Sequence, residues 1–472
     1  MGKYKRLLSN TAILGAGTFA SKVLVLLLMP LYTAILSASE FGTADLVAQT
    51  ANLLIPLASV GICDGIFRFA LEESADRKQV LSTGTAILLI GSVAVLGLVQ
   101  ILRCFEVFSG YVMLIAFYVI AANFHSAFAN YLRAEGKMAL FAVQGMINTA
   151  LTILLNILFL IVFDMGSLGY VLSVVLADTA VTVLLFFVAR LWRDLSPSSI
   201  NRRSAKDMLR FSIPYIPTTM MWLITSVSDR YIVAAYCGTA ENGLYAAAYK
   251  LPTLLSLVSG VFVEAWHFST VKDATDEEKS DFFGNVFVNF MSVMVMGASF
   301  LIVGAKIFTS ILLDESYFSS WEFVPVLVIA TLFSTLVSFL GSVYFLEKKS
   351  LLSMLTAMAG AVVNVILNFV MIPVHGAMGA AVATLISYLT VYMIRAVDTR
   401  NYLRFSLHTP RLVINTLLLL LQAVIMILSF RYWQIAELLI LLFLLVFNGR
   451  GIVRSVLGVI RSFLGKRRKK EK

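Results

Sequence analysis

The sequence predicts an all-α integral membrane protein, and three observations lead to this prediction. Apolar residues make up 59% of the 472 residues and charged residues only 14%, whereas about a quarter of a soluble domain is charged. The apolar residues form long continuous runs, unlike the strands of a transmembrane β-barrel, which alternate over about ten residues. Lysines and arginines gather between these runs, as they do on the cytoplasmic face of a membrane.

Fourteen apolar runs are candidates for transmembrane helices, each of which needs about 20 residues. Their approximate limits are 7–36, 42–62, 80–102, 111–131, 139–163, 168–190, 209–236, 243–268, 283–305, 321–346, 351–372, 376–394, 411–430 and 435–449. The opening stretch "MGKYKRLLSN" is basic, but the apolar run behind it is too long for the core of a cleavable signal peptide. It is therefore expected to be an uncleaved first span.

The basic residues orient these spans and explain the net charge of +10. With the N-terminus in the cytoplasm, the outer loops contain only three of the 37 lysines and arginines, namely Arg103, Lys306 and Arg431. This bias predicts that both termini are cytoplasmic in a multi-pass protein of the cell membrane. The tail "GKRRKKEK" is expected to contact anionic lipids, and no nucleic-acid partner is expected.

Several classes of function are excluded by what the chain lacks. No G-x-x-x-x-G-K-[ST] loop for ATP occurs, and the loops between spans are too short for a catalytic domain, so a membrane-embedded glycosyltransferase or polymerase is disfavoured. No metal site, catalytic residue or cofactor is expected. The four histidines are far apart and are interpreted as interfacial residues: His125, His267, His375 and His408. The three cysteines are interpreted as small apolar residues: Cys63, Cys104 and Cys237.

The chain contains a weak internal repeat. "YLRAEGKMALF" (131–141) resembles "YFLEKKSLLSM" (344–354), and a shift of 212 positions aligns Glu135 with Glu347, Lys137 with Lys349 and Asn156 with Asn368. Six predicted spans separate the copies, so both halves enter the membrane in the same direction. This is a parallel repeat of the kind found in transporters whose halves move about a central site.

Two further pairs of short motifs follow the same order. "GSLGYVLS" (166–173) resembles "GAMGAAVA" (376–383), and "SEFG" (39–42) resembles "AENG" (240–243). The predicted architecture is therefore two six-helix bundles around a central cavity, followed by a helix pair. Its parts are 1–195 (spans 1–6), 196–408 (spans 7–12), 409–450 (spans 13 and 14) and 451–472 (a basic cytoplasmic tail).

Three cations lie inside predicted spans. At 1.5 Å per residue, Arg230 lies about 9 Å from the outer end of span 7, and Lys250 about 10 Å from the outer end of span 8. Lys22 lies about 22 Å along span 1, near the middle of the membrane. Intramembrane charges usually face a bundle interior or an aqueous cavity, so these three cations could hold a phosphate-bearing substrate.

Acidic residues in the spans leave an alternative open. Asp229, Asp178 and Asp45 could instead neutralise the cations as pairs that pack helices together. Asp178, Asp229 and Glu264 are also candidates for carrying a coupling proton or sodium ion. The stretch "YAAAYKLP" (245–252) predicts close packing or a bend at Pro252.

Three stretches resemble a known family. "SKVLVLLLMPLYTAILSASEFGTADL" (21–46), "YLRAEGK" (131–137) and "SDRYIVAAYCGTAENGLYAAAYKLP" (228–252) resemble the polysaccharide-transporter branch of the multidrug/oligosaccharidyl-lipid/polysaccharide (MOP) exporter superfamily. The resemblance implies two six-helix lobes, a central cavity and two extra C-terminal helices. It also implies export of undecaprenyl-pyrophosphate-linked oligosaccharides by alternating access, for O-antigen, capsule or teichuronic acid. By motif position, the anion-binding role falls on Arg230 and Lys250, with Lys22.

The resulting hypothesis is a flippase for a lipid-linked sugar unit, and not an enzyme. Tyr231, Tyr245 and Tyr249 could contact the sugars, ordinary packing being the alternative. Besides the lipid-linked oligosaccharide, a polysaccharide polymerase and glycosyltransferases are candidate partners. The alternatives are a lipid II flippase, which also has fourteen spans and a cationic cavity, and a proton- or sodium-coupled multidrug exporter, which normally has twelve spans and acidic sites.

Overall fold

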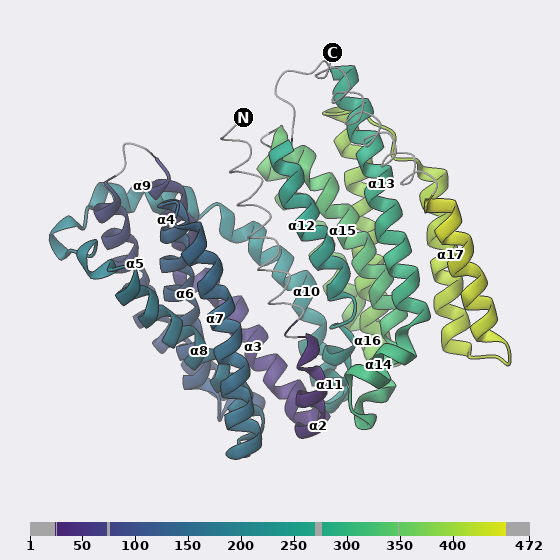
Figure 1. Ribbon diagram of the computed structural model, residues 1–472, viewed down its shortest axis with the longest axis horizontal. Helices are drawn as coiled ribbons and strands as arrows, with labels where there is room; N and C mark the ends of the chain where they lie inside the picture. The colour runs from purple at the N-terminus through teal and green to yellow at the C-terminus, as the bar shows by residue number, and fades with distance from the viewer. Residues whose placement is uncertain (1–23, 25, 73–75, 270–275, 348, 450–472) are drawn as a thin grey trace, which may run out of the picture. The chain divides into compact units, whose positions relative to one another are not determined.

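The computed structural model describes residues 24, 26–72, 76–269, 276–347 and 349–449. Within these ranges the chain forms helices and contains no strand, which confirms the predicted all-α class (Figure 1). The chain divides into two compact units. The first unit comprises Met1–Ala246 with Leu312–Tyr317, and the second comprises Ala247–Ile311 with Phe318–Lys472. Residues 196–246, which the sequence predicts to begin the second half of the chain, thus belong to the first compact unit.

The first unit contains the following helices: α2 (Met29–Ile35), α3 (Ala38–Ser59), α4 (Ile62–Ala70), α5 (Arg77–Leu98), η1 (Val99–Cys104), η2 (Glu106–Phe108), α6 (Val112–Ala134), α7 (Met138–Asn156), η3 (Ile157–Val162), α8 (Gly166–Val188), η4 (Leu191–Arg193), η5 (Pro197–Ser199), α9 (Arg202–Ser212), α10 (Tyr215–Cys237) and the start of α11 (Thr239–Ala248). A capping box begins α3, because Ser37 Oγ accepts from Glu40 N and Glu40 Oε2 accepts from Ser37 N. This arrangement satisfies backbone donors that the first helical turn leaves unpaired.

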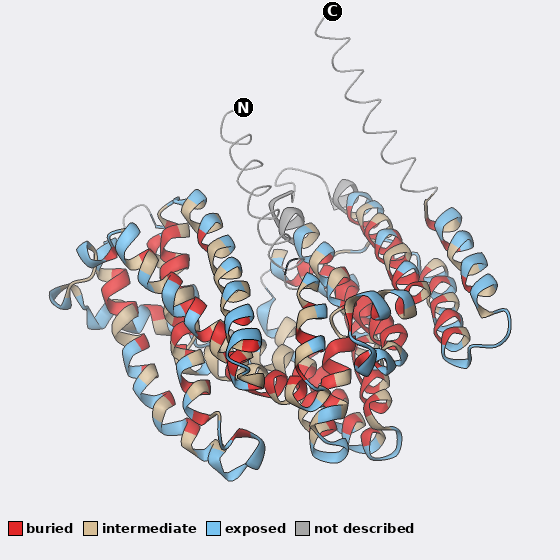
Figure 2. Ribbon diagram, turned by 60° about the horizontal axis from the view of Figure 1, so that its bottom comes forward, coloured by how far each residue is buried: buried red, intermediate tan, exposed pale blue. Residues whose placement is uncertain are grey.

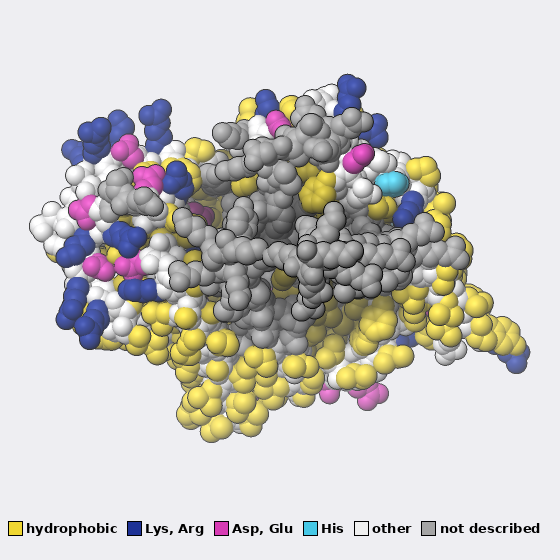
Figure 3. Space-filling model, turned by 45° about the horizontal axis from the view of Figure 1, so that its top comes forward, with side chains coloured by type: hydrophobic (Ala, Val, Ile, Leu, Met, Phe, Trp, Pro, Cys, Tyr) yellow, Lys and Arg dark blue, Asp and Glu magenta, His cyan; other side chains and the backbone are white. Residues whose placement is uncertain are grey.

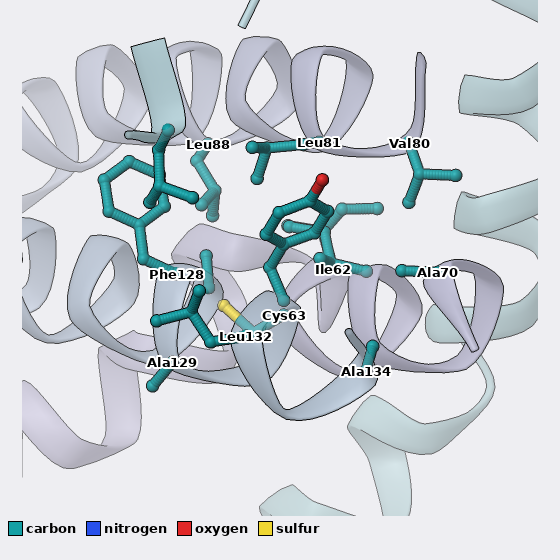
Figure 4. Close-up of a cluster of buried hydrophobic side chains, with 14 of the residues drawn as sticks. Ile62, Cys63, Ala70, Val80, Leu81, Leu88, Phe128, Ala129, Leu132 and Ala134 are labelled. Carbon is teal, nitrogen blue, oxygen red and sulfur yellow. The ribbon is translucent and has the colours of Figure 1, made fainter. Parts of the chain in front are cut away.

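The core of the first unit includes a cluster between α4, α5 and α6 (Figure 4). Ile62, Leu81 and Leu132 are fully buried there, and Cys63 lies among them as a small apolar residue. The interpretation of Cys63 is therefore confirmed. Cys104 and Cys237 are exposed, and all three thiols are free.

The second unit contains α12 (Thr253–Ser269), α13 (Asp276–Val303), α14 (Ala305–Leu312, whose last residue counts with the first unit), η6 (Glu315–Glu322, divided between the units), α15 (Val324–Leu346), α16 (Ser350–Asp398), η7 (Thr399–Asn401), α17 (Thr409–Leu428) and a last helix, Trp433–Gly449. The long helix α16 covers two predicted spans, 351–372 and 376–394. Two helices meet there at Gly376, where the chain turns and φ is 58°. That left-handed conformation favours glycine, which has no Cβ. The predicted interruption at Pro252 is also present, because α11 ends at Ala248 and α12 begins at Thr253.

The repeated motifs adopt the same local geometry in both halves. Lys137 precedes α7 with φ −78° and ψ 53°, and Lys349 precedes α16 with φ −95° and ψ 54°. Each backbone N–H donates to the carbonyl five residues earlier, on Leu132 and Tyr344 respectively. Gly166 and Gly376, which open the second pair of motifs, both have positive φ, at 54° and 58°. The weak sequence repeat therefore corresponds to a repeat of structure at these turns.

Eight described helices are long and apolar enough to cross a membrane, or ten if each of two bent pairs forms one span. Exposed aliphatic side chains on these helices, such as Ile90 on α5 at 72% and Val374 on α16 at 74%, fit contact with lipid tails. Figure 2 shows buried residues on the faces that neighbouring helices turn toward each other within each unit. The protein is thus a multi-pass membrane protein, while the count of fourteen spans stays a prediction.

Basic side chains gather at one end of the first unit (Figure 3). Exposed residues there include Arg77 at the start of α5, Arg190 after α8 and Arg203 on α9. Hydrogen bonds hold this end together: Ser82 Oγ donates to the Asp194 carbonyl, and Asn201 N donates to Thr83 Oγ1. The bundle therefore has a polar, positively charged end that suits a membrane surface.

Candidate functional site

Arg230 on α10 is paired with Asp45 on α3. Its Nη1 lies 2.5 Å from Asp45 Oδ2, and both side chains are only 9% exposed. Gln49, one turn further along α3, donates to the other oxygen of Asp45 at 3.2 Å. In this conformation Arg230 thus has the helix-packing partner that the sequence left open as the alternative. A role in binding an anion stays a prediction, and it requires this pair to open.

The neighbours of Arg230 on α10 are also engaged with other helices. Asp229 is fully buried, and its Oδ2 accepts a hydrogen bond from Tyr245 Oη on α11 at 2.6 Å. Tyr231 Oη and Thr50 Oγ1 on α3 are 2.8 Å apart. Asp229 and Arg230 are adjacent and cannot face each other, so each finds its own partner. In this conformation both Tyr231 and Tyr245 bind neighbouring helices, as the packing alternative predicted, and contact with sugars stays a prediction.

The repeated motifs "SEFG" and "AENG" touch each other within the first unit. A Cβ on Gly42 would lie 1.9 Å from the Thr239 carbonyl oxygen, and a Cβ on Gly243 would lie 1.9 Å from that of Ala38. Asn242 Nδ2 donates to the Gly42 carbonyl at 3.0 Å. The two glycine contacts are reciprocal, as across a two-fold axis. Glycine is required at both positions because the backbones of α3 and α11 approach so closely.

Asp178, a predicted ion-coupling candidate on α8, lies in a second polar cluster of the first unit. Its Oδ1 is 2.9 Å from His125 Nδ1 on α6 and accepts from Asn148 Nδ2 on α7 at 2.8 Å. The other ring nitrogen of His125, Nε2, is 2.6 Å from Gln144 Oε1 on α7. The interpretation of His125 as an interfacial residue is therefore wrong: only 15% of its side chain is exposed, between three helices.

The remaining predicted residues are placed only in part. Lys22 lies outside the described residues, and the side chain of Glu264 on α12 is likewise not described. Tyr249 and Lys250 are half-buried in the turn between α11 and α12, and they belong to the second unit. Lys250 N donates to the Ala247 carbonyl at 3.1 Å. The predicted convergence of Lys22, Arg230 and Lys250 on one chamber accordingly stays a prediction.

The second unit contains a pocket of about 440 Å³ on two membrane-spanning segments, α12 and α15. Its lining includes five hydroxyl side chains: Ser256, Ser259, Ser334, Thr335 and Ser338. Ser256 and Ser338 are exposed, and Ser259 is 4% exposed. A lipid-facing surface would be apolar, so a stripe of hydroxyls here favours contact with water or with a polar substrate. This pocket is not evident from the sequence, because serines in an apolar run give no strong signal.

The second unit also contains a buried arginine that the sequence pattern does not reveal. Arg395 on α16 is 1% exposed, and its guanidinium donates to Thr356 Oγ1 at 3.0 Å and to the Val337 carbonyl at 2.9 Å. Its Nη1 also occupies the space that a Cβ on Gly341 would need, at 2.7 Å. The predicted span ended one residue before Arg395, which made it look like a loop residue. No group of three or more His, Cys, Asp or Glu residues that could hold a metal occurs in the described ranges.

Comparison with known proteins places the chain in a family. The family model described as "Polysaccharide biosynthesis protein" matches residues 7–267. The solved structure of the lipid II flippase MurJ in an inward closed conformation is similar with a TM-score of 0.71 and 13% identity, covering 94% of this chain and 100% of that chain. No curated protein matches the chain in sequence.

Two other solved structures share the fold at lower similarity. An inward-facing multidrug resistance MATE family transporter of the MOP superfamily has a TM-score of 0.61 and 14% identity, covering 80% of this chain and 94% of that chain. A MOP superfamily transporter from Pyrococcus furiosus has a TM-score of 0.55 and 12% identity, covering 83% of this chain and 95% of that chain. The chain therefore belongs to the family of polysaccharide biosynthesis proteins and has the fold of the MOP superfamily transporters.

Proposed function

We propose that this protein is a flippase that moves undecaprenyl-pyrophosphate-linked oligosaccharide units from the inner to the outer leaflet of the cytoplasmic membrane. The family match carries the link to polysaccharide biosynthesis, and the fold supports a flippase or exporter rather than an enzyme. The units would serve a surface polysaccharide of the O-antigen, capsule or teichuronic-acid type. Both termini would lie in the cytoplasm, and polymerase and glycosyltransferases would act on either side of the translocation step.

The hydroxyl-lined pocket supports the sugar part of this proposal. Sugars present many hydroxyl groups, and serine and threonine hydroxyls can both donate to them and accept from them. The pocket volume of about 440 Å³ lies within the usual range for small-molecule sites. Tyr249 and Lys250, at the bend before α12, belong to the same unit as the pocket. We assign Tyr249 to sugar contact and Lys250 to the pyrophosphate, together with Lys22 and Arg230.

Arg230 could meet an anion only when it leaves Asp45. In the present conformation the Asp45 carboxylate balances the positive charge of the guanidinium, so the pair does not attract an anion by itself. We propose that the pyrophosphate replaces Asp45 as the partner of Arg230 during transport. Asp229 would remain bound to Tyr245 and keep α10 on α11 in both states.

Complementation of a flippase-null strain tests the function. We expect the protein to restore surface polysaccharide and to clear the lipid-linked precursor from the inner leaflet. Ser259→Leu and Ser338→Leu would fill the pocket and lower export, whereas Thr390→Leu on α16, outside the pocket, is the matched control. Unchanged precursor accumulation in the presence of the well-folded wild-type protein would refute the function.

A charge swap tests the role of Arg230. The double variant Asp45→Arg with Arg230→Asp retains an ion pair between α3 and α10 but moves the cation to the other helix. We expect it to fold with normal thermal stability and to fail in export. Normal export by the double variant would show that the pair serves only to pack α3 on α10. Unchanged export after replacing Lys22, Arg230 and Lys250 together by alanine would refute the cationic site as a whole.

A lipid II flippase is the second candidate, because the MurJ structure covers nearly all of this chain. Rescue of a strain depleted of its lipid II flippase, without rescue of surface polysaccharide, would favour it. A multidrug exporter is the third candidate, on the likeness to MATE transporters. It predicts resistance to cationic drugs in cells that express the wild-type protein.

A further inference from the structure

His125 stands out because both nitrogens of its ring contact oxygen atoms inside a membrane-spanning bundle. Nδ1 lies 2.9 Å from Asp178 Oδ1, and Nε2 lies 2.6 Å from Gln144 Oε1. These three residues come from α6, α8 and α7, each of which is long and apolar enough to cross the membrane. Burying an ionisable pair within a membrane costs free energy, and such pairs usually mark a functional site.

We propose that His125 and Asp178 form a proton-binding site, with Gln144 as the group that senses the proton, and that this site couples transport to the proton gradient. The coupling part rests on the proposed transport function. Proton binding at the site does not, because it follows from the arrangement of the three side chains.

The hydrogen bonds indicate which nitrogen exchanges the proton. A neutral imidazole has one N–H, so it can donate to only one of two facing oxygen atoms. Two facing oxygen atoms are both satisfied only by the doubly protonated ring, whereas a neutral ring requires the Gln144 amide to present its NH₂ group. When the proton leaves, the Nε2–H bond breaks, its electron pair stays on nitrogen, and a water molecule accepts the proton. This step requires water to reach the ring of His125, whose side chain is 15% exposed.

Loss of this proton changes one helix contact and preserves another. Nδ1–H continues to donate to Asp178, so the link between α6 and α8 remains. Nε2 becomes an acceptor, and the Gln144 amide must rotate to present its NH₂ group or separate from the ring. The link between α6 and α7 therefore depends on the proton. Asn148 Nδ2 still donates to Asp178, which keeps its negative charge compensated in part.

Few other ionisable groups face the site. The sequence of α7 contains no acidic, basic, tyrosine or cysteine residue. On α8 the ionisable residues are Asp178 and Tyr170, and the nearest one before His125 on α6 is Tyr118. Asp45 on α3, which also packs on α6, is bound to Arg230. The other α-helices packed on α6 are α4 and α5, whose ionisable residues are Cys63, Asp64, Arg68, Arg77 and Lys78. Asp178 is thus the counter-charge of His125.

Proton binding is measured without any substrate. In purified protein with ¹⁵N-labelled histidine, His125→Gln identifies the signal of His125 among the four histidines. We expect this signal to titrate with pH, and Asp178→Asn to move its midpoint by about one pH unit, since a neighbouring charge is removed. Gln144→Met keeps both charged residues and should also move the midpoint. A ring that does not titrate between pH 5 and 9, or a midpoint that neither variant moves, overturns the site.

Coupling is measured in proteoliposomes with a lipid-linked oligosaccharide and an imposed pH gradient. We expect nigericin, which collapses the gradient, to slow wild-type export several-fold, and His125→Gln to show one slow rate with or without nigericin. The control is His375→Gln, at an exposed position, which should behave as the wild type. Equal nigericin sensitivity of His125→Gln and wild type overturns the coupling. No export by the wild type refutes the proposed function instead, and the histidine titration then decides the site alone.

Discussion

Two aspartates of the first unit lie within the bundle beside different basic side chains. Asp45 on α3 binds the guanidinium of Arg230, and Asp178 on α8 binds the imidazole of His125. The guanidinium stays protonated at every physiological pH, whereas an ordinary imidazole loses its proton near pH ~6.5. The Arg230 pair therefore keeps both charges at any physiological pH, whereas a pair built on an imidazole keeps them only while the ring is protonated.

The surroundings of the two pairs also differ: closely packed backbones lie near Asp45, and amide side chains surround Asp178. The Asp45 pair lies one helical turn from Gly42, where α3 crosses α11 at Gly243. The two backbones are in contact there, so neither helix can move without disturbing the other. The Asp178 pair is surrounded by the amides of Gln144 and Asn148, which can rotate and exchange donor for acceptor. Close backbone packing therefore surrounds the Asp45 pair, and amides that can exchange donor for acceptor surround the Asp178 pair.

The largest expected effect is the loss of one partner of the Arg230 pair. Arg230→Leu should lower the free energy of unfolding by about 3–5 kcal/mol, because it leaves Asp45 buried without its cation. Adding Asp45→Leu should recover most of this loss, since two apolar side chains can replace a buried pair. Denaturant unfolding in detergent measures both. Equal stability of the single and double variants would show that the pair does not couple α3 to α10.

The next effect comes from the glycine crossing that sets the position of Asp45. Gly42→Ala should destabilise the protein by about 1–3 kcal/mol, because its Cβ would overlap the Thr239 carbonyl. Gly145→Ala on α7, where a Cβ meets nothing within 4 Å, is the control and should be neutral or slightly stabilising. Thermal unfolding of the two variants decides. If both behave alike, the close approach does not limit packing.

The pH dependence of stability separates the two pairs directly. The His125 pair carries opposite charges only while the ring is protonated, so its contribution is present at low pH and fades as the ring loses its proton. His125→Gln should therefore cost about 1–2 kcal/mol at pH 5.5 and less at pH 8.5. Arg230→Leu should cost the same at both values. A pH-independent loss for His125→Gln would contradict a titrating site.

The smallest effect tests a neutral contact of the same seam. Tyr231→Phe removes the hydrogen bond to Thr50 and should cost about 0.5–1.5 kcal/mol. Tyr245→Phe should cost more, because Asp229 is fully buried and loses a donor to its carboxylate. Unfolding measurements on the pair give the order. The reverse order would mean that Asp229 carries no charge in the folded protein.

Much of the fold could be predicted from the sequence, since apolar length and basic loops follow directly from the membrane as a solvent. The repeat was also detectable, because Lys137 and Lys349 begin helices after the same turn and Gly166 and Gly376 need the same positive φ. Glycine and turn residues record local backbone geometry, which depends on few neighbours.

The sequence offers three aspartates as partners for the cations, but it does not select Asp45 as the one that binds Arg230. Asp45 and Arg230 are 185 positions apart, and either could have faced water or lipid. The partner of His125 is equally hidden, because an isolated histidine in an apolar run carries no sign of the aspartate 53 positions later. The hydroxyl pocket likewise needs α12 and α15 to lie side by side.

By itself, the sequence determined that this protein lies in a membrane, that its spans are helical and that its halves repeat, because these properties depend on composition, length and local turns. Only the tertiary structure decided which cation each aspartate meets. That outcome depends on which side-chain atoms come within hydrogen-bonding distance, about 3 Å, when the helices pack. Such contacts join residues that no local pattern connects.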